Sequence, residues 1–266
     1  MDVFYSFLLT AVAGLSTGIG SLIAFFAKKT NKRFLAISLG FSAGVMIFVA
    51  LVEIYQEAFH NLSTHLGESW GGWVTILSFF GGIGLIAIID KLIPEGENPH
   101  EAKAVLADCP ECEKRHMMRT GAFTALAIAI HNFPEGLAAF VSALEEPTVA
   151  LPIVAAIAIH NIPEGISVAV PIYQATGSRK RAFWYSFLSG LAEPIGALVG
   201  WLLLMPLLET SGAVLGVVFG VVAGIMVFIS VDELLPAARE YGENHLSIYG
   251  LVGGMALMAV SLQLFK

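Results

Sequence analysis

The sequence predicts an all-α integral membrane protein with eight transmembrane helices, and three observations lead to this fold class. First, 56% of the 266 residues are hydrophobic and 13% are charged, whereas soluble proteins carry about 25% charged residues. Second, the apolar residues gather in eight runs of roughly 20 residues, the length that crosses a ~30 Å hydrocarbon core. Third, all 14 Lys and Arg residues except Lys266 fall in alternate loops. This composition argues against a nucleic-acid binder, a disulfide-stapled secreted domain and a large soluble catalytic domain.

The expected helices follow one another along the chain, each ended by a polar or basic segment. Basic residues between Lys28 and Arg33 separate the first two runs, and a long polar loop, about 94–119, follows the third. No basic segment precedes the first run, so we expect no cleaved signal peptide. We treat 1–266 as a single transmembrane domain with spans at Phe4–Ala27, Phe34–Gln56, Gly71–Ile93, Gly121–Ala143, Val149–Tyr173, Phe183–Met205, Ala213–Ala237 and Leu246–Phe265.

The basic residues predict the orientation of the chain. They lie in or beside the loops after the first, third, fifth and seventh runs, whereas the intervening loops carry Glu but neither Lys nor Arg. By the positive-inside rule, the four basic loops are cytoplasmic and both termini are outside. We therefore expect a multi-pass protein of the cell (inner or plasma) membrane.

Internal repeats indicate a transporter. The ten residues that begin at Ala127 recur 29 residues later, and the segment that begins at Ala43 matches the one that begins at Ala223 without a gap. A weaker match joins 14–20 to 190–196, and for this pair a chance likeness of Gly-rich segments remains an alternative. The first and second spans then correspond to the sixth and seventh in inverted orientation. Inverted repeats are typical of transporters, whose sites lie near the midplane where the repeats meet.

A polar cluster is expected at this midplane. In each copy of the first repeat a His precedes a Glu by four residues, so both lie on one helix face. The two His and the acid of the sixth span lie ten to twelve residues into their spans, roughly 15–18 Å deep at 1.5 Å per residue. A proline in each motif frees a backbone carbonyl, which needs a partner in hydrocarbon. The residues are His131, Asn132, Glu135, His160, Asn161, Glu164 and Glu193.

Buried carboxylates and imidazoles at this depth are functional candidates by default. Together they suit Zn(II) and Fe(II) and are compatible with Mn(II) and Co(II). With three acids, we expect two divalent ions sharing bridging carboxylates, and one ion with its hydration shell is the alternative. A buried hydrogen-bonded network that only specifies packing is the competing structural interpretation.

These motifs closely resemble the ZIP family of divalent-metal transporters, and within it the bacterial zinc-transporting group. The resemblance is carried by HNFPEG at 131–136, HNIPEG at 160–165, GFSAGVM at 40–46, GLAEPIG at 190–196 and SVDELLP at 230–236, and it covers essentially the whole chain. It implies a 3+2+3 arrangement of eight helices with inverted repeats and metal uptake toward the cytoplasm. It also implies metal ligands at the seven cluster residues, with Glu193 as the bridging acid, and at Met46 in the second span.

Further acidic and histidine residues lie at the two mouths of the expected path. Glu53, Glu57 and His60 are at the outer end of the second span, and Asp232 and Glu233 are near the inner end of the seventh. Carboxylates at each mouth would raise the local cation concentration. Ordinary solvation of helix ends is the alternative.

The cytoplasmic loop carries a second candidate metal site. Both cysteines of the chain, Cys109 and Cys112, form a CxxC motif between His100 and His116. Because disulfides are rare in the cytoplasm, this pattern favours a thiolate metal site that senses or receives the ion. A disordered linker and redox chemistry are the alternatives.

The leading hypothesis is a secondary transporter that imports Zn(II), with Fe(II), Mn(II), Co(II) and Cd(II) as further candidates. Alternating access rests on the resemblance alone, and no Walker motif for ATP drive is present. We expect no enzymatic activity and no catalytic cofactor, since the metal is the transported substrate. An intramembrane metal-dependent hydrolase is the rival, although no HExxH pair appears, and a metal-gated channel or sensor stays open. The expected partners are divalent metal ions and the lipid bilayer, with no nucleic acid, and homodimer formation is left open.

Overall fold

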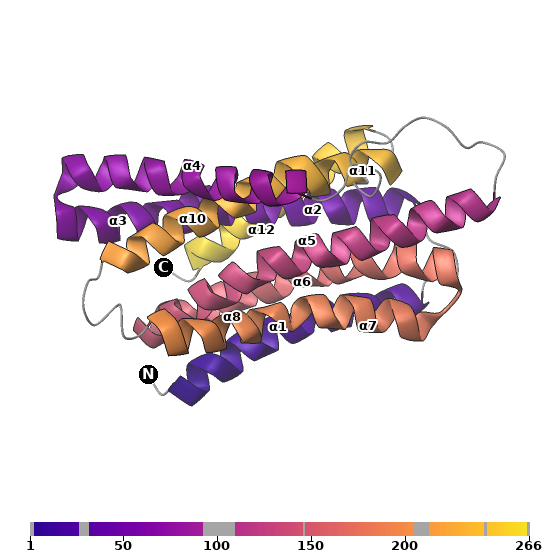
Figure 1. The fold of residues 1–266 in the computed structure, drawn as a ribbon, viewed down its shortest axis with the longest axis horizontal. Helices are drawn as coiled ribbons and strands as arrows, with labels where there is room; N and C mark the ends of the chain where they lie inside the picture. The colour runs from indigo at the N-terminus through magenta and orange to yellow at the C-terminus, as the bar shows by residue number, and fades with distance from the viewer. Residues whose placement is uncertain are drawn as a thin grey trace.

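The computed structural model describes residues 3–26, 32–92, 110–145, 147–204, 213–241 and 244–264, and these residues form an all-helical bundle (Figure 1). The predicted all-α fold with eight helices is therefore confirmed. We call each helix, or each run of consecutive helical segments, a rod. The first four rods are α1 (Val3–Phe26), α2–η1–α3 (Lys32–Val49, Ala50–Ile54, Tyr55–Leu66), α4 (Glu68–Leu92) and α5 (Pro110–Glu145). The other four are α6 (Pro147–Thr176), α7–α8–η2 (Arg179–Gly190, Ala192–Val199, Gly200–Leu204), α10–η3–α11 (Ala213–Ile229, Ser230–Leu234, Leu235–Tyr241) and α12 (Asn244–Leu264).

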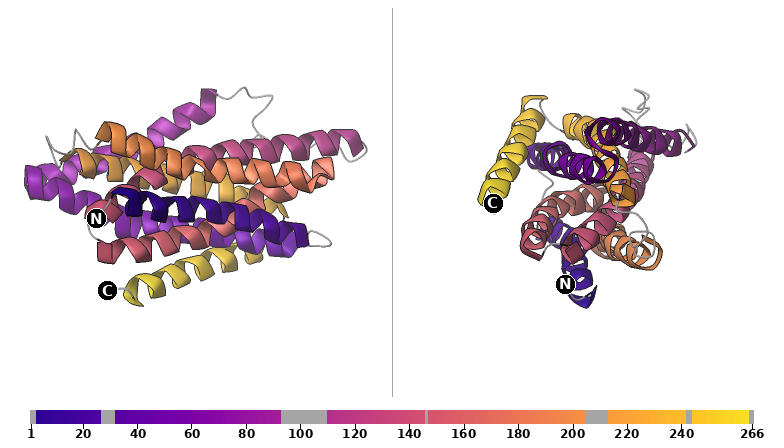
Figure 2. Two further views of the ribbon diagram at one scale, coloured as in Figure 1. Left: turned by 90° about the horizontal axis from the view of Figure 1, so that it is seen from below. Right: turned by 90° about the vertical axis from the view of Figure 1, so that its left-hand side faces the viewer.

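The helices have the length and composition of membrane spans. Among the described residues, six helices are long and apolar enough to cross a membrane. The other two rods are α6, which has 30 residues, and the sixth rod, which is divided at Leu191 into α7 and α8. Large apolar side chains such as Trp70, Leu77 and Ile88 are exposed on the outside of the bundle, as lipid-facing residues are. The beginning of α1 and the end of α12 lie at the same end of the bundle (Figure 2), as an even number of crossings requires.

The rods form two groups that agree with the inverted repeat. The rods α1, α5, α6 and α7–α8 pack together, and α2–α3, α4, α10–α11 and α12 form the other group (Figure 1). Within them, α1 packs on α6 and α5 on α8, while α2 packs on α12 and α4 on α10. Exchanging the first three rods with the last three, and the fourth with the fifth, maps these pairs onto one another. The 3+2+3 arrangement itself stays a prediction with which this packing agrees.

Two π-helical segments occupy equivalent places in the repeat. η1 interrupts the second rod and η3 interrupts the seventh, and both begin seven residues after the start of the matching segments at Ala43 and Ala223. Short π-helical segments inside α-helices are frequent at functional sites. η1 contains Glu53, and η3 contains Asp232 and Glu233.

The second rod continues beyond the expected span. The sequence predicts that the span ends at Gln56, whereas the helix runs to Leu66. It ends where Gly67 takes a φ of 81°, a backbone conformation that a residue without a Cβ adopts readily, and the Gly67 N–H donates to the Ser63 carbonyl. Residues 57–66 therefore extend the helix of the second span at its expected outer end.

Candidate metal centre

The central cluster is built on two adjacent helices, α5 and α6, which pack against each other. His131 and Glu135 lie one turn apart on α5, and His160 and Glu164 repeat this spacing on α6. Both helices remain continuous through the proline of each motif. All four residues are buried, with at most 2% of their residue surface exposed. The i, i+4 spacing therefore brings four nitrogen- and oxygen-bearing side chains into the interior of the bundle.

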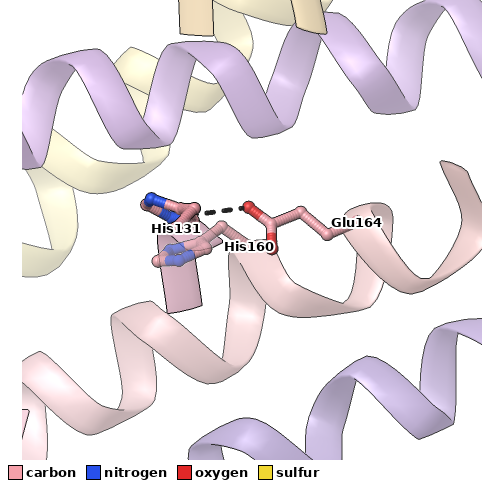
Figure 3. A group of neighbouring side chains, drawn as sticks. All are labelled: His131, His160 and Glu164. Carbon is pink, nitrogen blue, oxygen red and sulfur yellow. Dashed lines mark ion pairs between the residues drawn. The ribbon is translucent and has the colours of Figure 1, made fainter. Parts of the chain in front are cut away.

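The Glu135 carboxylate lies between the two imidazoles. Its Oε1 is 2.8 Å from Nε2 of His160, and its Oε2 is 3.3 Å from Nε2 of His131. The second acid, Glu164, approaches from α6, with Oε1 3.9 Å from Nε2 of His131. His131, His160 and Glu164 each offer a ligand atom within 4.8 Å of the others, and Figure 3 shows the three side chains pointing toward one another. The geometry thus supplies a compact set of imidazole and carboxylate donors.

Some of the nitrogen and oxygen atoms that could bind a metal have no hydrogen-bond partner within the part of the chain that the structure describes. They include Nδ1 of His131 and Oε2 of Glu164, whereas Nε2 of His131 and the two Glu135 oxygens make the imidazole–carboxylate contacts given above. Buried polar atoms in folded proteins are nearly always hydrogen-bonded, so each exception calls for a partner such as water or an ion. The donors also have the chemistry of a borderline divalent metal site.

The second rod supplies residues from the other helix group. Met46, predicted as a ligand, is fully buried on α2. Ser42, one turn earlier, has its Oγ 3.9 Å from the Met46 sulfur and 3.5 Å from Oε1 of Glu164. The sequence analysis did not single out Ser42. Its position four residues before Met46 in the GFSAGVM segment is the signal that would have found it.

The two asparagines donate hydrogen bonds to other helices of the same group. The Asn161 amide donates to Glu193 and to the carbonyl oxygen of Ala13, the latter at 3.0 Å. The Asn132 amide donates to the carbonyl oxygen of Ser189 at 3.2 Å. These bonds tie α6 to α1 and α8, and α5 to α7. Glu193, which is fully buried, reaches the cluster through Asn161 and is not part of the group formed by His131, His160 and Glu164.

The remaining candidates lie away from the cluster. Glu57 and His60 are exposed on α3, where the Asn61 amide donates to Glu57 at 3.0 Å. Glu53, Asp232 and Glu233 are partly buried in the π-helical segments. In the loop site, His100 and Cys109 lie outside the described residues. Cys112 and His116 begin α5, but their side chains are outside the described part.

Comparisons with known proteins identify the family of this chain. The family model for ZIP zinc transporters matches residues 93–262. The chain is 63% identical to the zinc transporter ZupT of Streptococcus mutans, over 99% of this chain and 98% of that protein. It is 59% identical to ZupT of Clostridium perfringens and 60% identical to ZupT of Lysinibacillus sphaericus, with 97% and 98% of those proteins covered. The resemblance seen in the motifs is thereby confirmed, and the chain belongs to the ZIP family of zinc transporters.

Proposed function

We propose that this protein imports Zn(II) across the cell membrane into the cytoplasm and that the ion is held on the way by the His131, Glu135, His160 and Glu164 side chains. Fe(II), Mn(II), Co(II) and Cd(II) are further candidate substrates, because the same nitrogen and oxygen donors bind several divalent metals. The observation that carries the proposal is the compact buried group in which His131, His160 and Glu164 each offer a ligand atom within 4.8 Å of the others. The ZupT relatives, which are named as zinc transporters, support it.

The Glu135 carboxylate supports a centre for two ions. Its two oxygens face different imidazoles, one on each helix. A bridging carboxylate presents its oxygens to two metals in this way, so each His would share Glu135 with one ion. Glu164 and Glu193 would add charge to balance the second ion. A single ion with its hydration shell is the alternative, and zinc titration to saturation separates the two by stoichiometry.

The position of the cluster supports alternating access. α5 and α6 belong to one helix group, whereas Ser42 reaches Glu164 from α2 in the other group and also contacts Met46. An apolar cavity of about 620 Å³ lies between α4 and α10 on one side and α5 and α8 on the other. Because apolar surfaces form few directional bonds, the two groups can shift there at little cost. We propose that such a shift opens the centre to the two faces in turn.

The proposal also covers the residues at the two ends of the ion path and the orientation of the protein in the membrane. Glu53, Glu57 and His60 would collect ions outside, and Asp232 and Glu233 would accept them inside, with both termini outside. Met46 and Asn161 would complete the coordination of the ion directly, and Asn132 would contribute through a bound water molecule. The CxxC loop would receive or sense the metal in the cytoplasm.

Zinc entry into proteoliposomes that contain a zinc-sensitive dye tests this function. The wild-type protein should admit zinc, and His131→Ala and Glu164→Ala should abolish the flux while keeping normal folded yield. His245→Ala is the matched control, because His245 is an exposed histidine on α12. Zinc that binds tightly without crossing the membrane would contradict transport and favour a sensor or a metal-dependent hydrolase. Flux that persists in both variants would contradict the proposed site.

A further inference from the structure

Thr17 stands in the first repeat where Glu193 stands in the second. The segment 14–20 reads GLSTGIG and the segment 190–196 reads GLAEPIG, so the fourth residue is Thr17 in one and Glu193 in the other. Both residues are fully buried. The question for the chemistry of the centre is whether Thr17 and Glu193 also occupy equivalent positions in the structure.

The asparagine contacts of the two repeats agree with the match. The Asn161 amide donates to the carbonyl of Ala13, and the Asn132 amide donates to the carbonyl of Ser189. Ala13 and Ser189 each immediately precede the matched segments. Exchanging the first rod with the sixth and the fourth with the fifth therefore maps one hydrogen bond onto the other.

The helix crossing between α1 and the sixth rod obeys the same exchange. A Cβ atom on Gly14 would lie 3.1 Å from the Cβ of Glu193, and one on Gly190 would lie 2.9 Å from the Cβ of Thr17. Each of these glycines also faces the carbonyl oxygen of the other. Thr17 thus lies beside Gly190 as Glu193 lies beside Gly14, and the weaker of the sequence repeats has a counterpart in the packing.

The symmetry breaks at the polar ends of the side chains. On one side, the Asn161 amide donates to the Glu193 carboxylate. On the other side, Oγ1 of Thr17 and Oδ1 of Asn132 make no hydrogen bond within the described residues. Asn132 donates to the Ser189 carbonyl, and Thr17 adjoins Gly190, so both side chains border the same stretch of the sixth rod. Each of these buried oxygens calls for a hydrogen-bond partner.

We propose that Thr17 and Asn132 form an uncharged oxygen subsite, the counterpart of the Asn161–Glu193 pair, which holds a water molecule bound to the transported divalent ion. Metal-bound water is a strong donor of two hydrogen bonds, and this subsite offers two acceptors. Thr17 is then a positioning residue that acts on the ion through water. The subsite makes the centre asymmetric, with an acid on one side and a hydrated ligand on the other. This inference rests on the proposed zinc transport.

Thr17→Val tests the subsite because valine keeps the branched shape and removes the hydroxyl. A hydrogen bond to a charged group is worth enough to shift affinity by about tenfold. We expect the KM for zinc flux and the zinc dissociation constant to rise about tenfold, with the maximal flux at saturating zinc retained. Thr17→Ser keeps the hydroxyl and should return both values to those of the wild type.

Thr10→Val is the matched control on the same helix. Thr10 is also fully buried, but its hydroxyl donates to the Ser6 carbonyl of its own helix at 3.0 Å. This variant should leave the KM unchanged. A wild-type KM in Thr17→Val, or an equal defect in Thr17→Ser, would overturn the inference while the wild-type flux still upholds the proposed function. Absence of zinc flux and zinc binding in the wild-type protein would instead overturn the proposed function.

Discussion

Glu135→Gln separates a metal centre from a network that only specifies packing. Glutamine keeps the shape of the side chain and removes its charge. It can still accept from one imidazole and donate to the other, so the 2.8 Å and 3.3 Å contacts to His160 and His131 can be retained. We therefore expect the metal-free variant to unfold within about 1.5 kcal/mol of the wild type, the size of one ordinary hydrogen bond.

Zinc binding should respond far more strongly to the same change. Loss of one charged interaction of about 2.7 kcal/mol raises the zinc dissociation constant about 100-fold, so that zinc binds more weakly. At a zinc concentration of 100 times the wild-type Kd, binding stabilises the wild type by about 2.7 kcal/mol, whereas the same zinc stabilises the variant by only about 0.4 kcal/mol. The variant should consequently lose most of the zinc-dependent rise in its unfolding temperature.

Thermal unfolding of the purified protein in nanodiscs, with zinc and with a chelator, measures both effects. Glu68→Gln is the control, because Glu68 is an exposed acid at the start of α4. A Glu135→Gln protein that is strongly destabilised without metal, and that still responds to zinc like the wild type, would refute the reasoning. The cluster would then be a structural network.

Three further predictions concern the helix crossing, the second rod and the loop. Gly14→Ala should destabilise the fold by about 1–3 kcal/mol through overpacking, because its Cβ would lie 2.5 Å from the Gly190 carbonyl oxygen, and this should lower the unfolding temperature and the folded yield. Gly81→Ala, whose Cβ would have nothing within 4 Å, should be neutral. Ser42→Ala should raise the KM for zinc a few-fold by removing the hydroxyl near Glu164, and an unchanged dose-response curve would argue against this contact. Cys109→Ser with Cys112→Ser should keep basal flux and alter its dependence on cytoplasmic zinc, whereas loss of all flux would place the loop on the obligatory path.

Local sequence spacing predicted the parts of the centre that lie within one helix. The four-residue interval between His131 and Glu135 requires a shared helix face whatever the tertiary fold, and 20-residue apolar runs require helices in hydrocarbon. The internal repeats also predicted that the first and second rods correspond to the sixth and seventh, and the fourth to the fifth. These features follow from helix geometry and need no knowledge of the partner helix.

Contacts between helices could not be derived in the same way. The bond of the Asn161 amide to Glu193 and the approach of Ser42 to Glu164 depend on how the helices cross and on side-chain rotamers. The π-helical segments and the continuation of the second rod to Leu66 also escaped prediction. Hydropathy marks where hydrocarbon begins, but a helix can continue into water when its own hydrogen bonds and packing support it.

X-ray absorption at the zinc edge, on protein loaded with one equivalent of zinc, tests most directly whether the ion is held at the central cluster. Imidazole and carboxylate ligands predict a nitrogen and oxygen shell at about 2.0–2.2 Å. This shell should be lost in His131→Ala and unchanged when Cys109 and Cys112 are both replaced by Ser. A spectrum dominated by sulfur at about 2.3 Å, or one that His131→Ala leaves unchanged, would contradict the account.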